Sequence, residues 1–534
     1  MCIRDRRKKM ILLALTLFIG LSACGNDDKE LPDEPGKEQG GNGGDEPESP
    51  DNPSGNEPVS WYVATTGNDG NSGTLDSPLK SISKALLRVN PGDTIFLREG
   101  AYHEFVTPTR SGEKGKLITL KSYPGETAKI DGTGMTIKGW FSALVQLKSV
   151  QYMTFENLHI CNATNSDVNT DPEGVYINGV SRDITFRNCK VYNIKSTCLA
   201  GHNNGDWRSA HAFLVIGDDN GTPIRNLTIE KCEIYDMHTG TSETLTIAGN
   251  VDGFTIQDCE VHDVENISVN YARNGVVRRN KVYRCSHQVS KDFWEGVYNN
   301  PAAYGAIGIY VCGGASTIIE QNIVWECDRA IGLVSESNVL ATKDCIVRNN
   351  FVYNNYRTGI YLGHYIGYTV GGTSGCYVVN NTLYHNNLVG GALNGSNNSE
   401  NINDEKDSEG EIRLAENCTN NTIMNNLIYA VTDRDIFVRK YTRSGSKNKI
   451  GYNLYYSPTS ANHKWFWDSV EYTNFSSWQK ASGDENSLYN VDPKLVSLDI
   501  SAPDLHLQSG SPAKNAGYFI AAYFVGSYDI DGNA

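Results

Sequence analysis

The sequence has little basic charge, only one apolar run, and none of the cysteine spacings that bind zinc. Its 534 residues carry 47 Lys and Arg against 62 Asp and Glu, a formal charge of −15, which excludes a nucleic-acid binder of the basic-patch kind. The apolar run, 10–21, is shorter than the roughly 20 residues that a membrane-spanning helix needs. The sequence contains no Cys-x-x-Cys pair and no histidine cluster, so nothing in it indicates a zinc site.

The first residues read as an export signal. Residues 1–9 are rich in Arg and Lys, 10–21 are apolar, and small residues precede Cys24, which is the pattern of a secretory signal peptide. The end of this segment resembles the lipobox of bacterial lipoproteins. The resemblance implies cleavage before Cys24, acylation of its thiol, and a lipid anchor on the outer membrane of a Gram-negative bacterium, with the protein at the cell surface. Met10 is an alternative start of the chain, so it stays open whether residues 1–9 belong to the native protein.

An acidic segment rich in Gly and Pro follows the predicted signal peptide 1–24. Residues 25–58 contain 11 acidic side chains and two lysines, and no apolar period runs through them. Such a composition cannot bury enough surface to offset chain entropy, so we expect a disordered tether. Removing the −9 of the tether and the +4 of 1–24 from the total of −15 leaves −10 for 59–534.

Residues 59–534 repeat one unit many times. A short strand, a polar corner and a second short strand recur at Ile184–Tyr192, Leu227–Tyr235, Phe254–His262, Val277–Tyr283, Ile319–Trp325, Ile346–Tyr353, Val378–Tyr384 and Ile423–Tyr429. Self-similarity at this period indicates a solenoid, and period-2 alternation with β-branched and aromatic residues makes it all-β. We therefore predict a right-handed, single-stranded parallel β-helix. The chain stops at Ala534 inside what reads as another coil, which leaves a truncated C-terminus open.

One position of the repeat holds a small or polar residue in every coil: Cys189, Cys232, Cys259, Asn280, Asn322, Asn350, Asn381, Asn426 and Asn453. Equivalent positions stack about 4.8 Å apart in a parallel solenoid, so the asparagine side chains are predicted to form a hydrogen-bonded ladder. Without Cys2 and Cys24 the domain has 11 of the 13 cysteines, an odd number that excludes complete pairing. We expect stacked free thiols, with an occasional bridge left open.

The open end of a solenoid needs a cover. Ser77 and Pro78 read as the N-cap and first turn of a helix. This helix is predicted to extend to about residue 89 and to cap the N-terminal end with one apolar face: Ile82, Leu86 and Val89.

The entry of the domain resembles that of secreted right-handed β-helix proteins. The resemblance rests on Trp61–Thr74, on Ser77-Pro78, and on Gly92–Leu97. Such proteins include pectate lyases of polysaccharide lyase family nine, the chondroitinase B and alginate lyase family, and glycoside hydrolases. The resemblance implies the fold and a polysaccharide partner, but the aspartate-rich calcium motif of the family-nine lyases is not found. Fold alone does not fix the reaction.

Function in a solenoid lies on outward positions and inserted loops. If Leu245 and its equivalents point inward, an exposed column results: Thr246, Ser268, Tyr310 and Tyr361. Two loops, 202–211 and 286–304, border it and carry aromatic and polar side chains, which suit sugar rings. We predict these substrate-binding residues: Asn266, Trp294, Tyr304, Tyr361 and His364.

Three functions stay open for this surface, each in a monomer that binds no nucleic acid. A polysaccharide lyase needs a neutralised uronate carboxylate and a base. The candidate proton-transfer residues are Arg273, Lys291 and Tyr310, and the candidate calcium ligands are Glu243, Asn266 and Glu336. A glycoside hydrolase needs two carboxylates across the groove, for which Glu243 with Glu336 or Asp292 is the pair to test. A glycan-binding or structural surface protein uses the groove without catalysis.

Overall fold

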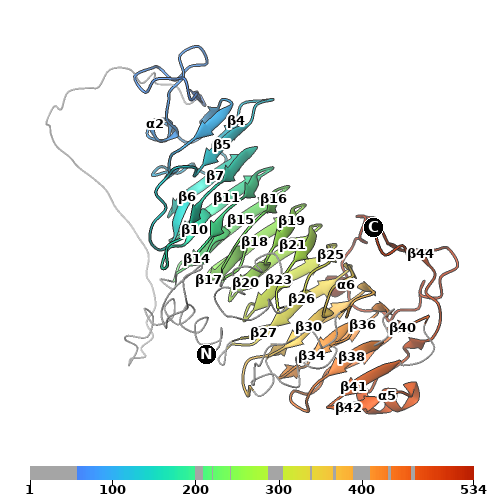
Figure 1. Cartoon of the computed structure of the whole chain (residues 1–534). Helices are drawn as coiled ribbons and strands as arrows, with labels where there is room; N and C mark the ends of the chain where they lie inside the picture. The colour runs from blue at the N-terminus through green and yellow to red at the C-terminus, as the bar shows by residue number, and fades with distance from the viewer. Residues whose placement is uncertain are drawn as a thin grey trace, which may run out of the picture. The chain divides into compact units, whose positions relative to one another are not determined.

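The computed structural model is a parallel β-helix. It describes residues 57–198, 209–218, 221–240, 242–286, 305–336, 340–364, 368–388, 409–430, 435–458 and 463–533. The chain divides into two units, Met1–Pro58 and Val59–Ala534. In the described part of the second unit, three long sheets contain 13, 12 and 13 strands. The predicted solenoid is therefore confirmed (Figure 1).

Between residues 142 and 456, each coil contributes one strand to each of the three long sheets. Sheet 1 contains, in spatial order, β1 (Ser60–Val63), β2 (Thr94–Leu97), β4 (Ile118–Ser122), β7 (Gln151–Glu156), β11 (Arg182–Arg187), β15 (Ile224–Glu230), β18 (Val251–Gln257), β21 (Arg273–Arg278), β24 (Ile318–Glu320), β28 (Ile346–Arg348), β32 (Tyr377–Val379), β36 (Thr422–Met424) and β39 (Lys449–Gly451). Sheet 2 contains β6 (Ser142–Lys148), β10 (Pro172–Asn178), β14 (His211–Gly217), β17 (Leu245–Gly249), β20 (Ile267–Asn270), β23 (Ile307–Cys312), β26 (Arg329–Val334), β30 (Thr358–Gly363), β34 (Ile412–Leu414), β38 (Ile436–Lys440), β41 (Lys464–Trp467) and the antiparallel β42 (Val470–Tyr472). Sheet 3 contains β3 (Gly100–Tyr102), β5 (Ala128–Asp131), β8 (Leu158–Cys161), β12 (Lys190–Tyr192), β16 (Glu233–Tyr235), β19 (Glu260–Val264), β22 (Lys281–Cys285), β25 (Ile323–Trp325), β29 (Phe351–Tyr353), β33 (Thr382–Tyr384), β37 (Leu427–Tyr429), β40 (Leu454–Tyr456) and β43 (Leu488–Tyr489).

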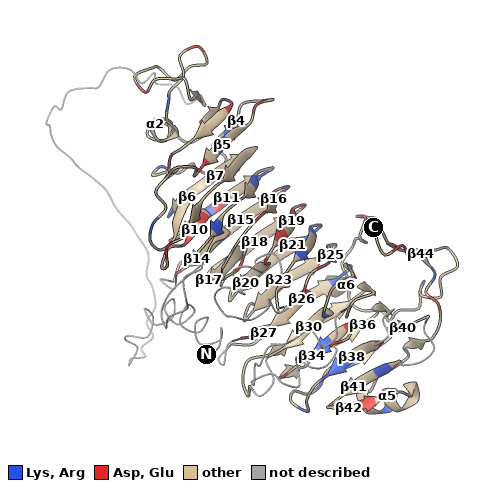
Figure 2. Cartoon of the chain, in the orientation of Figure 1, with Lys and Arg blue, Asp and Glu red and all other residues tan. Residues whose placement is uncertain are grey.

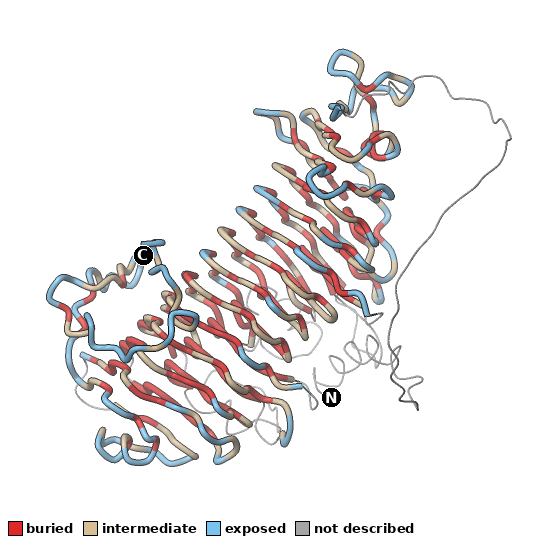
Figure 3. Tube along the Cα trace, turned by 180° about the vertical axis from the view of Figure 1, so that it is seen from behind, coloured by how far each residue is buried: buried red, intermediate tan, exposed pale blue. Residues whose placement is uncertain are grey.

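Short pairings supplement these sheets. They join β9 (Thr164–Asn165) to β13 (Lys195–Ser196), β27 (Thr342–Lys343) and β35 (Cys418–Thr419) to β31 (Thr373–Ser374), and β44 (Leu495–Ser497) to β45 (Asp504–Leu507). The inward side chains of the three long sheets form one apolar core, and buried positions recur from coil to coil (Figure 3).

The predicted asparagine ladder is confirmed at the corner between sheets 1 and 3. The side-chain amides of Asn280, Asn322, Asn350, Asn381 and Asn426 each donate to the amide oxygen in the next coil at 2.9–3.1 Å. The same oxygen also accepts the backbone N–H of the preceding coil. Because these groups are buried, the ladder satisfies polar atoms that would otherwise cost about 1–3 kcal/mol each.

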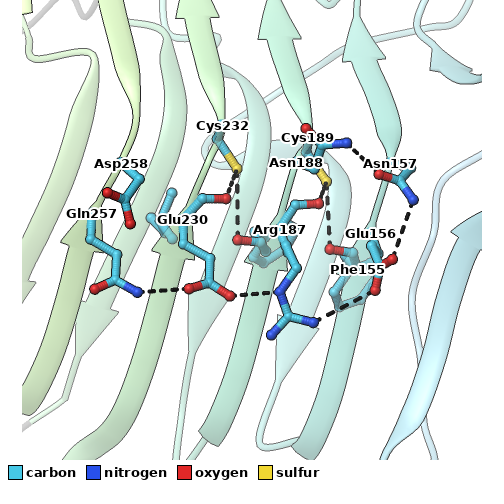
Figure 4. A network of polar contacts seen from close by, with 12 residues as sticks. Phe155, Glu156, Asn157, Arg187, Asn188, Cys189, Glu230, Cys232, Gln257 and Asp258 are labelled. Carbon is cyan, nitrogen blue, oxygen red and sulfur yellow. Dashed lines mark hydrogen bonds and ion pairs between the residues drawn. The ribbon is translucent and has the colours of Figure 1, made fainter. Parts of the chain in front are cut away.

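The cysteines continue the ladder toward the N-terminus. All 11 cysteines of the described residues are free and buried, as predicted. Some of them also donate hydrogen bonds through their thiols. The thiols of Cys189 and Cys232 donate to the carbonyls of Phe155 and Phe186 at 3.5 and 3.6 Å (Figure 4). Asn280 makes the equivalent bond through its amide. The thiol therefore replaces the amide donor in these earlier coils.

A left-handed residue precedes every ladder position. Nine coils share this geometry, with φ between 52° and 59°, at Asn188, Lys231, Asp258, Arg279, Gln321, Asn349, Asn380, Asn425 and Tyr452. Non-glycine residues rarely adopt positive φ, and asparagine and aspartate tolerate it best. This residue makes the sharp bend from sheet 1 to sheet 3. The outer surface beside it carries a charged network that includes Glu156, Arg187, Glu230 and Gln257 (Figure 4).

The ends of the solenoid are covered by short helices. α2 (Ile82–Leu86) buries Ile82, Leu86 and the following Val89, as predicted. Its N-cap, however, is Ser81, whose side chain accepts from Lys84 N. The predicted N-cap Ser77 was wrong, because Ser77 lies in a turn that bridges back to Thr74. At the other end, α5 (Phe475–Ser482) buries Trp478 against Trp465.

After α5 the chain turns back along sheets 1 and 3. Its last helix, α6 (Ala522–Val525), packs on β28 and β32, and the carbonyls of Tyr523 and Val525 accept from Arg348 and Asn349. Among the residues that the structure describes, most of the predicted functional residues lie on or beside sheet 2. No helix of the described residues is long and apolar enough to cross a membrane.

Candidate functional site on the outer face of sheet 2

The predicted outward column exists, but it is buried. Strand register aligns one residue per coil: Tyr176, Leu214, Thr246, Ser268, Tyr310, Gly332, Tyr361, Arg413 and Arg439. Tyr310 and Tyr361 each expose only 4 % of their surface, so the predicted exposure was wrong. The reason is a second apolar cluster on this outer face: Ile307, Tyr310, Cys312, Val334, Tyr361 and Ala415.

A second outward column runs where the strands of sheet 2 begin. Register aligns Ala143 with Glu173 and His211, and Ile307 with Arg329. Glu243 and Glu265 occupy the same position in the two coils between, two residues before the aligned Leu245 and Ile267. The column therefore presents ionisable residues in four successive coils and a fifth at Arg329.

His211 is the centre of the first part of this column. Its Nδ1 lies 3.0 Å from Glu173 Oε1, and its Nε2 lies 2.8 Å from Ser242 Oγ. Ser242 Oγ in turn lies 3.2 Å from Glu243 Oε2. Burial lowers the pKa of His211, although Glu243 and Asp171 act in the opposite direction. Burial raises the pKa of Glu173 well above its ordinary value.

Tyr310 and Glu336 form the middle of the site. The Tyr310 hydroxyl donates to Glu336 Oε1 at 2.7 Å. Burial raises the pKa of the neighbouring Cys312 to about 12, with Glu336 and Glu243 adding to the effect, so both carboxylates act on one thiol. Asn266, one coil earlier, is 8 % exposed, and its Oδ1 is buried without a hydrogen bond.

An arginine cluster forms the C-terminal part of the site. Arg329 and Arg413 each lie 2.7 Å from Glu409 Oε1, and Arg357 also contacts this oxygen. Burial raises the pKa of Glu409, but the three guanidiniums outweigh burial and hold it well below its ordinary value. All four side chains are buried. Their exposed fractions are 11 % for Arg329, 0 % for Arg413, 5 % for Arg357 and 2 % for Glu409.

Tyrosine rings separate the guanidiniums of this cluster. Arg413 lies 4.3 Å from the ring centre of Tyr361 and 4.9 Å from that of Tyr441. Arg439 lies 4.4 Å from the Tyr441 ring. Arg329, Arg357 and Arg413 thus surround the Glu409 carboxylate, and Arg439 extends the cluster across the Tyr441 ring. The outer face thus changes from acidic at β10 to basic at β34 and β38 (Figure 2).

The structure separates Arg273 from the other predicted residues. Arg273 begins β21 in sheet 1, not sheet 2. Its guanidinium lies 3.3 Å from Asp252 Oδ2 and donates to Asn250 at 3.1 Å. Four predicted residues lie outside the described residues: Cys24, Lys291, Trp294 and Tyr304. Asp292 lies outside them as well.

The remaining predicted residues lie on or beside sheet 2. His364 follows β30, is 1 % exposed and stacks on Tyr368 at 4.2 Å between ring centres. Glu243 and Glu336 are half-buried near Cys312. Among the residues that the structure describes, no group of three or more His, Cys, Asp or Glu is placed to hold a metal ion. A calcium site therefore depends on amide and backbone oxygens beside these carboxylates, and it stays a prediction.

Sequence reasoning missed Glu173, His211 and the arginine cluster. The repeat aligns Glu173 with His211, since each lies two residues before an inward Val175 or Phe213, but period-2 alternation would assign both side chains to the core. The repeat provides no such alignment for Glu409, which follows an insertion and reaches arginines from two preceding coils.

Comparison with known proteins places the chain in a family. The family model described as "Pel9A-like, right handed beta helix region" matches residues 61–272. The uncharacterized protein YwoF of Bacillus subtilis is 30 % identical over 466 residues, which cover 85 % of this chain and 92 % of YwoF. Pectate lyase PEL9 of Emericella nidulans is 30 % identical over 142 residues, or 24 % of this chain and 33 % of that enzyme.

A solved structure agrees on the fold. The lacto-N-biosidase of Eubacterium ramulus superposes with a TM-score of 0.50 at 14 % identity, covering 81 % of this chain and 68 % of that one. The match shows a shared fold and nothing about the reaction. Taken with the parallel sheets described above, these relationships establish that the chain belongs to the family of YwoF and that residues 61–272 match the Pel9A-like right-handed β-helix region.

Proposed function

We propose that this protein is a polysaccharide lyase that cleaves a uronic-acid polymer along the outer face of sheet 2, and that Cys24 anchors it to the outer membrane. The observation that carries the proposal is the cluster of Arg329, Arg357, Arg413 and Arg439 between tyrosine rings. The domain as a whole is acidic, so this buried concentration of guanidiniums beside sheet 2 is a local departure from its net charge.

Guanidiniums suit this chemistry because they pair with carboxylates in a planar, two-bond geometry. In β-elimination a base removes the proton next to the uronate carboxyl, a carbon–carbon double bond forms, and the glycosidic oxygen leaves with a proton. Neutralising the carboxylate makes the first proton more acidic. Tyr310 lies three strand spacings from Arg413 in one column, about 14 Å, which suits an extended polymer of several sugars.

The test is a panel of uronate-containing and neutral glycans, incubated with the purified domain in calcium or in chelator. A lyase leaves an unsaturated sugar that absorbs in the ultraviolet, and we expect this product from a uronate polymer. Arg329→Gln and Tyr310→Phe should each lower kcat/KM by about 100-fold or more. Arg279→Gln, which removes an ion pair with Asp258 on sheet 1, is the matched control and should retain activity.

Two results would contradict the proposal. New reducing ends without ultraviolet absorbance would identify a glycoside hydrolase, and no product from any glycan would favour a binding protein. Loss of activity in chelator with recovery in calcium would support a site formed by Glu243, Asn266 and Glu336. Full activity in chelator would remove calcium from the proposal.

A further inference from the structure

The hydrogen-bonded series Glu173, His211 and Ser242 has the order and distances of a nucleophilic triad. A carboxylate lies 3.0 Å from one nitrogen of the imidazole, and a serine hydroxyl lies 2.8 Å from the other. In serine hydrolases the carboxylate orients the histidine, and the histidine takes the hydroxyl proton. The three residues come from three successive coils, so the stacking of the solenoid holds them in line.

The exposed fraction increases along the series from the carboxylate to the serine, which is the residue that must reach a substrate. Glu173 and His211 expose 0 % and 1 % of their surface, whereas Ser242 exposes 7 %. Ser242 is therefore the most exposed of the three residues. Burial also favours the neutral imidazole, whose Nε2 can accept a proton. The Ser242 hydroxyl donates to Glu243 Oε2 at 3.2 Å, and rotation of the hydroxyl turns this proton toward Nε2 at 2.8 Å.

Two further hydroxyl side chains, those of Ser209 and Thr239, lie close to Ser242 in the chain fold. Ser209 precedes His211 and bridges Gly240, and Thr239 accepts the backbone N–H of Ser242. The side-chain oxygens of Ser209 and Thr239 are buried and make no hydrogen bond. Buried hydroxyls normally have partners. Two unsatisfied donors beside a nucleophile are the kind of group that stabilises the oxyanion of an acyl-transfer intermediate.

We propose that Ser242, His211 and Glu173 form a second catalytic site, which hydrolyses carboxylic esters. Ser242 Oγ attacks the ester carbonyl while His211 takes its proton. The alcohol leaves with that proton, and water then releases the acid from the serine. Register places this site two coils, about 10 Å along the solenoid axis, before the coil of Tyr310. If the proposed lyase function holds, the ester is a substituent of the same polysaccharide.

The experiment uses two probes that contain no sugar, so its outcome does not depend on lyase activity. A fluorophosphonate reacts when the serine oxygen displaces fluoride from phosphorus, and mass spectrometry of the wild-type protein locates the adduct. Hydrolysis of 4-nitrophenyl acetate gives the rate. We expect the adduct on Ser242, loss of at least about 1,000-fold in rate for Ser242→Ala, and roughly 100- to 10,000-fold for Glu173→Gln.

The matched control is Ser181→Ala, since Ser181 is also buried but donates to the carbonyl of Asn178. This variant should keep both the adduct and the rate. The labelling rate of the wild type should rise with pH, because burial raises the pKa of Glu173 and the triad needs its ionised form; Asp171 and Glu243 are the other acids acting on the imidazole. Absence of an adduct on Ser242 in the wild-type protein, or an equal rate in Ser242→Ala, would overturn the proposal.

Discussion

Replacing Glu411 by Gln should stabilise the protein at neutral pH and leave it unchanged in acid. Glu411 is the last member of a second ladder, at the corner between sheets 3 and 2. Asn355 donates to Asn386 at 2.7 Å, and Asn386 donates through its backbone and side chain to the two oxygens of Glu411 at 3.0 and 2.7 Å. Complete burial, with a smaller contribution from Asp435, raises the pKa of Glu411 from 4.5 to about 8.

The sign and size of the expected difference in stability follow from the linkage between proton binding and folding. A carboxyl whose pKa is raised by folding favours the folded state below its unfolded pKa, and this contribution is lost as pH rises toward the folded pKa. Between pH 4.5 and pH 7 the loss is about 3 kcal/mol, at about 1.36 kcal/mol for each pH step of one. A glutamine at this position has no proton to lose and can accept from Asn386 as the ladder asparagines do.

Urea unfolding of the wild type and Glu411→Gln from pH 4 to pH 9 measures this difference. The two midpoints should nearly coincide at pH 4 and separate progressively up to pH 8, with the variant the more stable. Glu113→Gln, at an exposed turn, should follow the wild type throughout. A separation that is the same at pH 4 and pH 8 would show that Glu411 does not bind its proton more tightly in the folded state.

Two further predictions concern the ladder and the anchor. Asn350→Leu should lower the free energy of unfolding by about 1–3 kcal/mol, because it leaves buried partners in two coils unsatisfied; Lys114→Leu in an exposed turn should change it little, and equal stabilities would contradict the ladder argument. Labelled palmitate should attach to the full chain and Cys24→Ser should abolish attachment, whereas membrane retention of that variant would contradict the lipobox interpretation.

The repeat predicted the fold because a parallel solenoid places the same residue type at the same depth in every coil. Asn322 and Asn350 could be assigned to a ladder from the sequence alone, since a buried amide in successive coils has one obvious partner. The left-handed corner was not predicted. Lys231 and Arg279 occupy it as well as asparagine, so residue type alone carries too weak a signal.

The site was predicted only in outline. The alignment of Tyr310 and Tyr361 followed from period-2 alternation and proved correct. Their burial could not be predicted, because it depends on an outer apolar cluster and not on strand periodicity. The meeting of Glu409 with Arg329 joins residues 80 positions apart, and only the number of residues inserted between coils decides that they face each other.

The ladder has a direction, and this direction bears on how the chain can fold during synthesis. Each asparagine gives its backbone N–H and one amide hydrogen to the oxygen in the following coil. A coil that has just left the ribosome therefore holds two donors that stay unsatisfied until the next coil arrives. The series ends when Asn453 donates to the hydroxyl of Ser487, which is held by Asp484. A nascent chain that stops before Ser487 would leave the backbone N–H of Asn453 without its partner. Loss of the first coils would instead remove carbonyls that accept from retained amides, such as the Ile256 carbonyl that accepts from Asn280.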